Sequence, residues 1–159
     1  MIMPTLIPQS GANGPKHGAV VSADSASGED AGLDTIRIVI VEDDWFVSME
    51  IEHIVETAGY DVVGVATSAD EAVALATQRQ PDLILMDIRL RGDSDGVEAA
   101  IEINRRHGIR CLFCSAHNDS GTIERAQAAA PAGWVSKPFS GPQLTEAIAA
   151  ALEALRERD

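Results

Sequence analysis

Between Thr35 and Arg156 the sequence alternates five times between a short apolar run and a longer segment whose apolar residues recur at helical spacing. The apolar runs cover residues 35–41, 61–66, 81–86, 109–114 and 132–136. Short runs rich in Val, Ile and Leu are typical of strands buried on both faces, and the segments between them favour amphipathic helices. Strict alternation of this kind predicts parallel strands joined by right-handed crossovers, with helices on both faces of one sheet.

The length of the alternating region favours one fold, and that fold has a known strand order. About 125 residues in five strand–helix units match the flavodoxin-like doubly wound α/β fold, (βα)5, a five-stranded parallel sheet with strand order 2-1-3-4-5. In this topology, ligands bind where the connections diverge, at the carboxyl ends of the first and third strands. Residues that follow those strands are therefore the first candidates for a functional site.

Local signals mark the ends of the expected helices. Gly59 is expected to close the first helix, and Ser68 with Glu71 has the spacing of a capping box at the start of the second. The first helix has its apolar stripe between Val47 and Ala58. The remaining helices are expected over residues 95–106, 121–129 and 140–156.

The segment before this pattern has a different composition. Residues 1–34 are rich in Gly, Ser, Ala and Pro and show no sustained period of either 2 or 3.6. Such a composition is typical of a flexible tail, in which residues 1–7 form a short apolar stretch. We therefore expect two parts, a flexible N-terminal tail over residues 1–34 and a folded domain over residues 35–157.

Charge and hydropathy exclude several classes of function. The chain has 25 acidic and 12 basic residues, and its formal net charge of −13 repels nucleic-acid phosphates. No apolar run approaches the roughly 18 to 20 residues that span a bilayer, and the N-terminus lacks the pattern of a signal peptide. We therefore expect a cytoplasmic protein with no direct nucleic-acid binding and no membrane insertion.

Cysteine and histidine spacing favours neither a redox centre nor a zinc site. Cys111 and Cys114 lie three residues apart in an expected strand, so their side chains face opposite sides of the sheet, which disfavours a disulfide between them. The four histidines have no spacing typical of zinc ligands. We interpret both cysteines as small core residues in a reducing compartment.

Polar residues follow four of the five expected strands. Glu42 and Asp43 follow the first strand, Asp87 the third, Ser115 the fourth and Lys137 the fifth. Each residue alone has an ordinary structural explanation, such as a turn residue or a surface charge. Because parallel strands end at the same edge of a sheet, however, all five are expected to share one site.

These side chains suit divalent-metal and phosphoryl chemistry. The carboxylates of Glu42, Asp43 and Asp87 are hard oxygen ligands, which favour Mg²⁺ or Mn²⁺. A carboxylate is also a nucleophile toward phosphorus, and phosphoryl transfer requires mainly positioning and neutralisation of the phosphoryl oxygens. Lys137 and the Ser115 hydroxyl are suited to that second task.

Four segments match one family in order and spacing. The segments IVIVEDD, LILMDIRL, FCSA and WVSKPF resemble those of the receiver domain of two-component response regulators, and the resemblance covers about residues 35–156. One such segment occurs by chance, whereas four in order, each at a strand end, are specific. The resemblance implies a phosphorylation switch in which Asp87 accepts a phosphoryl group from a sensor histidine kinase or a histidine phosphotransfer protein.

The resemblance also implies a set of metal ligands. Asp43 and Asp87 correspond to the carboxylates that bind Mg²⁺ or Mn²⁺ directly, and Glu42 to an acidic residue that acts through water. The backbone carbonyl of Arg89 corresponds to a further ligand. Asp44, which follows these acids, is better explained as the N-cap of the next helix.

Further residues resemble the parts of the family that respond to phosphorylation. Ser115 corresponds to the hydroxyl residue that turns toward the phosphoryl group, and Lys137 to the cation that contacts it. Trp134 stands at the aromatic switch position, where Tyr or Phe is usual. The peptide bond from Lys137 to Pro138 is expected to be cis, as is common in these domains.

The loop after the phosphoacceptor departs from the family's usual pattern. Receivers often have a proline four residues after the phosphoacceptor, where this chain has Arg91, and the segment to Gly96 is one residue longer. Arg89 and Arg91 are most simply interpreted as solvated loop charges. The sequence alone assigns Arg91 no role.

Two classes of function remain. A phosphorylation switch would act by changed binding to an unidentified target protein or by relaying the phosphoryl group, with a dimer through the fourth helix, fifth strand and fifth helix as one arrangement. An aspartate-nucleophile phosphohydrolase would need an acid two residues after the nucleophile, where this chain has Arg89. Because no output domain follows the last helix, we expect a stand-alone receiver that catalyses at most its own phosphorylation and dephosphorylation.

Overall fold

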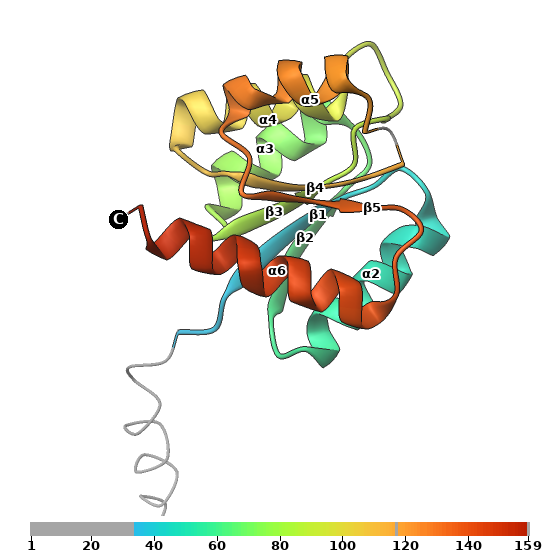
Figure 1. Cartoon of the computed structure of the whole chain (residues 1–159), viewed down its shortest axis with the longest axis vertical. Coiled ribbons are helices and arrows are strands. Elements are labelled where there is room, and N and C mark those ends of the chain that lie inside the picture. The colour runs from blue at the N-terminus through green and yellow to red at the C-terminus, as the bar shows by residue number, and fades with distance from the viewer. Residues whose placement is uncertain (1–33, 117, 159) are drawn as a thin grey trace, which may run out of the picture. The chain divides into compact units, whose positions relative to one another are not determined.

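The computed structural model describes residues 34–116 and 118–158. The expected tail therefore lies outside the described residues, apart from Asp34. Within them, five strands and five α-helices alternate along the chain (Figure 1). The strands are β1 (Arg37–Val41), β2 (Asp61–Ala66), β3 (Leu83–Met86), β4 (Cys111–Ser115) and β5 (Gly133–Ser136). The helices are α2 (Trp45–Thr57), α3 (Ala69–Arg79), α4 (Gly96–His107), α5 (Ser120–Ala126) and α6 (Gly141–Arg156), with a 3-10 turn, η2 (Gln127–Ala129), after α5.

The strands form one parallel sheet in the order β2-β1-β3-β4-β5. This order confirms the doubly wound topology that the strand–helix alternation predicts. It places β1 and β3 side by side, with Val41 opposite Met86 at their carboxyl ends. Residues that follow these two strands therefore start from adjacent positions at one edge of the sheet.

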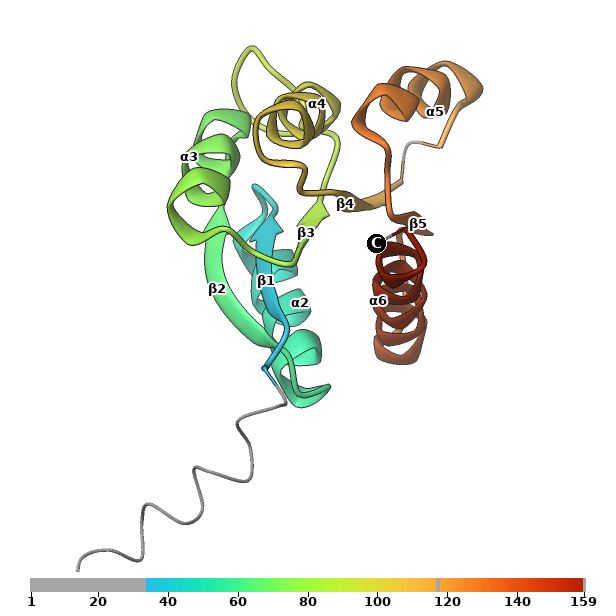
Figure 2. The same cartoon turned by 90° about the vertical axis from the view of Figure 1, so that its left-hand side faces the viewer.

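Helices cover both faces of the sheet, and each face has its own apolar core (Figures 1 and 2). Alternate residues of β1, β3 and β4 face α2 and α6 on one side, and the intervening residues face α3, α4 and α5 on the other. Cys111 belongs to the α3–α4–α5 side and Cys114 to the α2–α6 side, and both are free and buried. This arrangement confirms that the two thiols lie on opposite faces of the sheet.

Helix caps follow the predicted signals with one change of partner. The Ser68 hydroxyl accepts a hydrogen bond from the Glu71 amide, as expected for an N-cap. The Glu71 carboxylate, however, accepts from the amide and hydroxyl of Thr67, one residue before the predicted partner. These hydrogen bonds lower the pKa of Glu71. Gly59, which follows the C-cap Ala58 of α2, has a positive φ of 95°, which a glycine tolerates without strain.

Helix lengths and compositions also bear on membrane association. The longest described helix, α6, has 16 residues and carries charged side chains. Among the described residues, no helix combines the length and the apolar character that a bilayer crossing requires.

Candidate functional site

The carboxyl end of β1 delivers three acidic residues in a row. The amide of Glu42 donates to the carbonyl of Ala66 at 2.9 Å, which continues the sheet and buries the Glu42 side chain, 3% exposed. One Glu42 carboxylate oxygen, Oε1, accepts from the Asp44 amide at 3.1 Å. Asp44 in turn is the N-cap of α2, because its Oδ1 accepts from the Val47 amide. Asp43, between them, is half-buried at the same edge.

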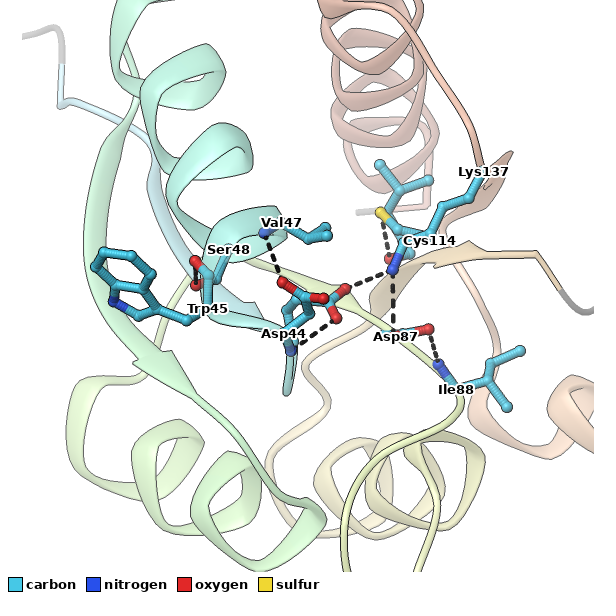
Figure 3. A network of polar contacts seen from close by, with 10 residues as sticks. Asp44, Trp45, Val47, Ser48, Asp87, Ile88, Cys114 and Lys137 are labelled. Atoms are coloured by element: carbon cyan, nitrogen blue, oxygen red, sulfur yellow. Dashed lines mark hydrogen bonds and ion pairs between the residues drawn. The ribbon is translucent and has the colours of Figure 1, made fainter.

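Asp87 follows β3 directly beside this acidic turn. Its amide donates to the carbonyl of Val41 at 3.0 Å, which extends the β1–β3 pairing by one residue. The side chain is only 11% exposed, and its Oδ1 accepts from the amide of Ile88 at 2.8 Å. Its other oxygen, Oδ2, points toward Lys137 (Figure 3).

Lys137 reaches the acidic cluster from the end of β5. Its amide donates to the carbonyl of Ser115 at 3.1 Å, and its peptide bond to Pro138 is cis. The Nζ donates to Glu42 Oε2 at 2.5 Å and to Asp87 Oδ2 at 3.2 Å. One ammonium group therefore joins the ends of β1, β3 and β5.

The cluster carries more negative charge than this lysine neutralises. Burial raises the pKa of Glu42, the charge of Asp87 adds to this, and the hydrogen bond from Lys137 only partly opposes it. Burial acts to lower the pKa of Lys137, but its hydrogen bond to Glu42 and the charge of Asp87 outweigh burial, so that pKa is raised. A further cation would relieve the crowding of carboxylates.

Three carboxylates lie close enough to share one metal ion. Glu42, Asp43 and Asp87 each offer an oxygen, and these oxygens lie within 4.8 Å of one another. An all-oxygen donor set of this kind fits Mg²⁺ or Mn²⁺. The side chain of Arg89 is exposed, and the role that we predict for this residue rests on its backbone carbonyl alone.

The two predicted switch residues lie on the strands beside the site. Ser115 ends β4, is fully buried and pairs in register with Ser136 of β5. Trp134, in β5, stacks on Phe113 of β4 with ring centroids 4.7 Å apart and an interplanar angle of 27°. The indole is thus half-buried against the core on the α3–α4–α5 side.

The sequence does not predict two of the contacts at the site. Gly96, the first residue of α4, packs directly on the backbone of Asp87, and its amide donates to the carbonyl of Ile88 at 2.7 Å. The Nε of Arg91 lies 3.9 Å from Oδ2 of Asp43. A glycine directly after the N-cap Asp95 is a weak signal of a close backbone approach. The sequence holds no signal that pairs Arg91 with Asp43, because the contact depends on the path of the loop.

Exposed apolar side chains flank the acidic turn. Trp45, Phe46 and Met49 at the start of α2 are 64%, 76% and 48% exposed, and the two rings meet edge to face. Trp45 points away from Asp87 and Lys137 (Figure 3). This patch therefore lies beside the acidic cluster without entering it.

Known proteins share both the sequence and the fold of this chain. The sequence model of one family, the response regulator receiver domain, matches residues 38–149. The transcriptional regulatory protein PdtaR of Mycobacterium tuberculosis is 34% identical over 121 residues, which cover 76% of this chain and 58% of PdtaR. The phyllosphere-induced regulator PhyR of Methylorubrum extorquens is 34% identical over 81% of this chain and 48% of PhyR. The chain thus spans about half the length of these two relatives.

Relatives of receiver length match along most of their own chains. The chemotaxis protein CheY of Thermotoga maritima is 32% identical over 70% of this chain and 93% of its own. The signal receiver domain of a modulated diguanylate cyclase from Desulfovibrio desulfuricans G20 has a TM-score of 0.73 and 32% identity, covering 79% of this chain and 100% of its own. On the combined evidence of sequence match, strand order and relatives, the chain belongs to the response regulator receiver domain family of two-component signalling.

Proposed function

We propose that this chain is a phosphorylation-dependent signalling switch whose phosphoacceptor is Asp87. The phosphoryl donor is a sensor histidine kinase or a histidine phosphotransfer protein, and the reaction depends on Mg²⁺ or Mn²⁺. The observation that carries the proposal is the meeting of Glu42, Asp43 and Asp87 with the single ammonium group of Lys137 at one edge of the sheet. A cytoplasmic location fits such a donor.

The metal ligands in this proposal come from adjacent strand ends. Asp43 and Asp87 bind the ion directly, Glu42 acts through water, and the carbonyl of Arg89 supplies a further oxygen. The oxygen donor set and the excess negative charge support this assignment. When bound, the ion supplies positive charge to the phosphoryl oxygens as the transferred group passes between donor and acceptor.

Asp87 acts as the nucleophile of the transfer. One of its carboxylate oxygens forms a bond to phosphorus while the bond from phosphorus to the donor's imidazole nitrogen breaks, and that nitrogen keeps the electron pair and takes up a proton. The Ile88 amide holds the carboxylate in place through Oδ1. Lys137, 3.2 Å from Oδ2, contacts the phosphoryl oxygens and neutralises part of their charge.

The new charge on Asp87 is the signal. A phosphoryl group adds negative charge and strong hydrogen-bond acceptors, and the Ser115 hydroxyl turns toward it. Ser115 is the last residue of the strand that carries Phe113, on which Trp134 stacks, so the shift reaches the aromatic switch and the α5–β5–α6 surface. Output is altered binding to a target protein, relay of the phosphoryl group, or a dimer through this surface.

The alternative class, an aspartate-nucleophile phosphohydrolase, has less support. Such an enzyme needs an acid two residues after the nucleophile to protonate the leaving group. Arg89 occupies that position, is exposed and has no ionisable proton to give at neutral pH. We therefore treat any hydrolysis of the aspartyl phosphate as part of the switch's own cycle.

The test is acyl-phosphate formation at Asp87. The full chain is incubated with Mg²⁺ and acetyl phosphate, and the gain of one phosphoryl group is followed by intact-protein mass spectrometry. The adduct should be lost with hydroxylamine, which cleaves acyl phosphates. Asp87→Asn should abolish labelling, whereas Asp93→Asn, which changes an exposed carboxylate in the same loop, should leave it intact.

Two outcomes would overturn the proposal. Labelling that persists in Asp87→Asn moves the phosphoacceptor elsewhere. A chain that takes no label from acetyl phosphate, phosphoramidate or any sensor kinase tested, while remaining folded and bound to Mg²⁺, is not a phosphoacceptor.

A further inference from the structure

Backbone contacts fix the position of Arg91 beside the acidic cluster. Its backbone forms an isolated parallel bridge with Ser68, in the loop between β2 and α3. Gly92 follows with φ of 104°, which turns the chain back toward α4. The backbone of Arg91 is therefore held in place, while its side chain is 81% exposed.

The three carboxylates of the cluster divide between two cations. Glu42 and Asp87 are paired with Lys137 in a largely buried contact. Asp43 takes no part in the ion pairs of Lys137 among the described residues, and its Oδ2 lies 3.9 Å from Arg91 Nε. Among the described residues, Arg91 is the one basic side chain within ion-pair distance of Asp43.

We propose that Arg91 is the resident counter-ion of Asp43 and that a divalent cation must displace it, so that Arg91 lowers the metal affinity of this domain. The inference rests on the proposed metal site and adds a residue that the sequence resemblance leaves without a role. Arg91 acts through Asp43 and is a positioning residue, since it contacts neither the phosphoryl group nor the metal.

The strength of the effect follows from the charges and their exposure. A guanidinium about 4 Å from a carboxylate oxygen repels a second cation that approaches the same oxygen. The side chain of Arg91 is exposed, and exposed ion pairs are weak because water and salt screen them. Displacement is therefore easy, and the expected change in metal affinity is about threefold to tenfold.

The experiment is a Mg²⁺ titration of the full chain by isothermal titration calorimetry, in the absence of any phosphodonor. At physiological salt, Arg91→Ala should bind Mg²⁺ about threefold to tenfold more tightly than the original chain, and this difference in affinity should narrow in 0.5 M NaCl. Arg91→Lys, which keeps the charge, should stay within about twofold of the original chain. The bridge to Ser68 is formed by the backbone, so both variants should keep the loop.

Arg105→Ala is the matched control. It removes the same charge from an exposed position near the carboxyl end of α4, nine residues and about 14 Å along the helix from Gly96. At physiological salt that distance exceeds the screening length of about 8 Å, so this control should bind Mg²⁺ as the original chain does.

The outcomes separate this inference from the proposed function. If the original chain binds Mg²⁺ and Arg91→Ala has equal or weaker affinity, the counter-ion inference is wrong and the metal site stands. If Arg91→Ala gains affinity and Arg105→Ala gains as much, the effect is one of net charge and the inference is also wrong. If the original chain does not bind Mg²⁺ or Mn²⁺ at all, both proposals fail together.

Discussion

An ideal Cβ built on Gly96 would lie 1.9 Å from the carbonyl oxygen of Asp87, a separation at which two atoms overlap. The same Cβ would lie 2.9 Å from the Asp87 carbonyl carbon and 3.0 Å from the Cα of Ile88. The first residue of α4 thus packs directly on the backbone of Asp87, the proposed phosphoacceptor. The position of α4 and the position of Asp87 cannot change independently.

Gly96→Ala should therefore displace Asp87. The overlap involves backbone atoms, so the loop or the helix must move, and we expect the free energy of unfolding to fall by about 1 to 3 kcal/mol. Labelling by acetyl phosphate should also slow, because the carboxylate leaves its place beside Lys137. Urea denaturation and mass spectrometry measure the two effects.

Gly141→Ala is the matched control for this substitution. Gly141 is also the first residue of a helix, but its nearest added contact is Ile54 Cγ1 at 3.8 Å, an ordinary separation. The control should change stability by less than about 1 kcal/mol and should label normally. Equal stability and equal labelling of the two variants would show that the Gly96 contact is not restrictive.

Lys137→Met should lower the stability of the metal-free protein. It leaves Glu42, which is 3% exposed, and Asp87 without their shared cation. We expect a loss of about 1 to 3 kcal/mol at pH 7 in EDTA, and a partial recovery with Mg²⁺. Arg106→Met, which breaks an exposed pair with Glu102 on α4, should cost no more than about 0.5 kcal/mol.

The loss in Lys137→Met should shrink as the pH falls. Burial already raises the pKa of Glu42 in the folded protein, and removal of Lys137 takes away an interaction that lowers it. A carboxyl group with a raised pKa in the folded state opposes folding when it is ionised, and this cost disappears as the pH falls through that pKa. Urea denaturation at pH 5 and pH 7 tests the trend. A deficit that is constant or larger at pH 5 would contradict it.

The two cysteines should resist modification until the protein unfolds. Burial raises the pKa of Cys111 from 9.0 to about 12, and burial also raises the pKa of Cys114. Because the thiolate is the reactive form, this raised pKa makes the native Cys111 much less reactive than an ordinary thiol. Iodoacetamide should label both cysteines in urea and neither in native buffer. Rapid labelling of the native chain would show that one face of the sheet opens readily.

Fluorescence of Trp134 should report coupling between Asp87 and the aromatic switch. Trp45 and Trp134 are the two tryptophans of the chain, and Trp45→Phe leaves Trp134 as the sole indole. Under the proposed coupling, phosphorylation should change the emission of Trp134, because a turn of Ser115 would rearrange its stack on Phe113. A chain that labels fully while the emission stays constant would rule out the coupling that we propose.

The strand ends were the most predictable part of the site. Because parallel strands end at one edge, the positions of Glu42, Asp87 and Lys137 after apolar runs were enough to predict that they meet, and the Lys137 contacts agree with that prediction. The opposite placement of Cys111 and Cys114 followed from the period of a strand in the same way. Both predictions use only the geometry of regular backbone.

The loop contacts were not predictable from the sequence. Arg91 meets Asp43 because a bridge to Ser68 and a turn at Gly92 set the path of the loop, and neither follows from local propensity. The Glu71 carboxylate reaches Thr67 in place of Ser68 for a similar reason, since the choice between adjacent amides depends on the dihedral angles of one residue. Site residues on regular strands were thus easier to place than those on loops.

The stack of Trp134 on Phe113 lies on one face of the sheet only. Side chains alternate along β4, so Ser115 shares its face with Phe113, and the stack belongs to the core beneath α3, α4 and α5. Leu112 and Cys114 lie on the opposite face of β4 and belong to the core beneath α2 and α6. Under the proposed switch, a change at Ser115 therefore acts first on the core beneath α3, α4 and α5, and it reaches the α6 part of the α5–β5–α6 surface only through the sheet.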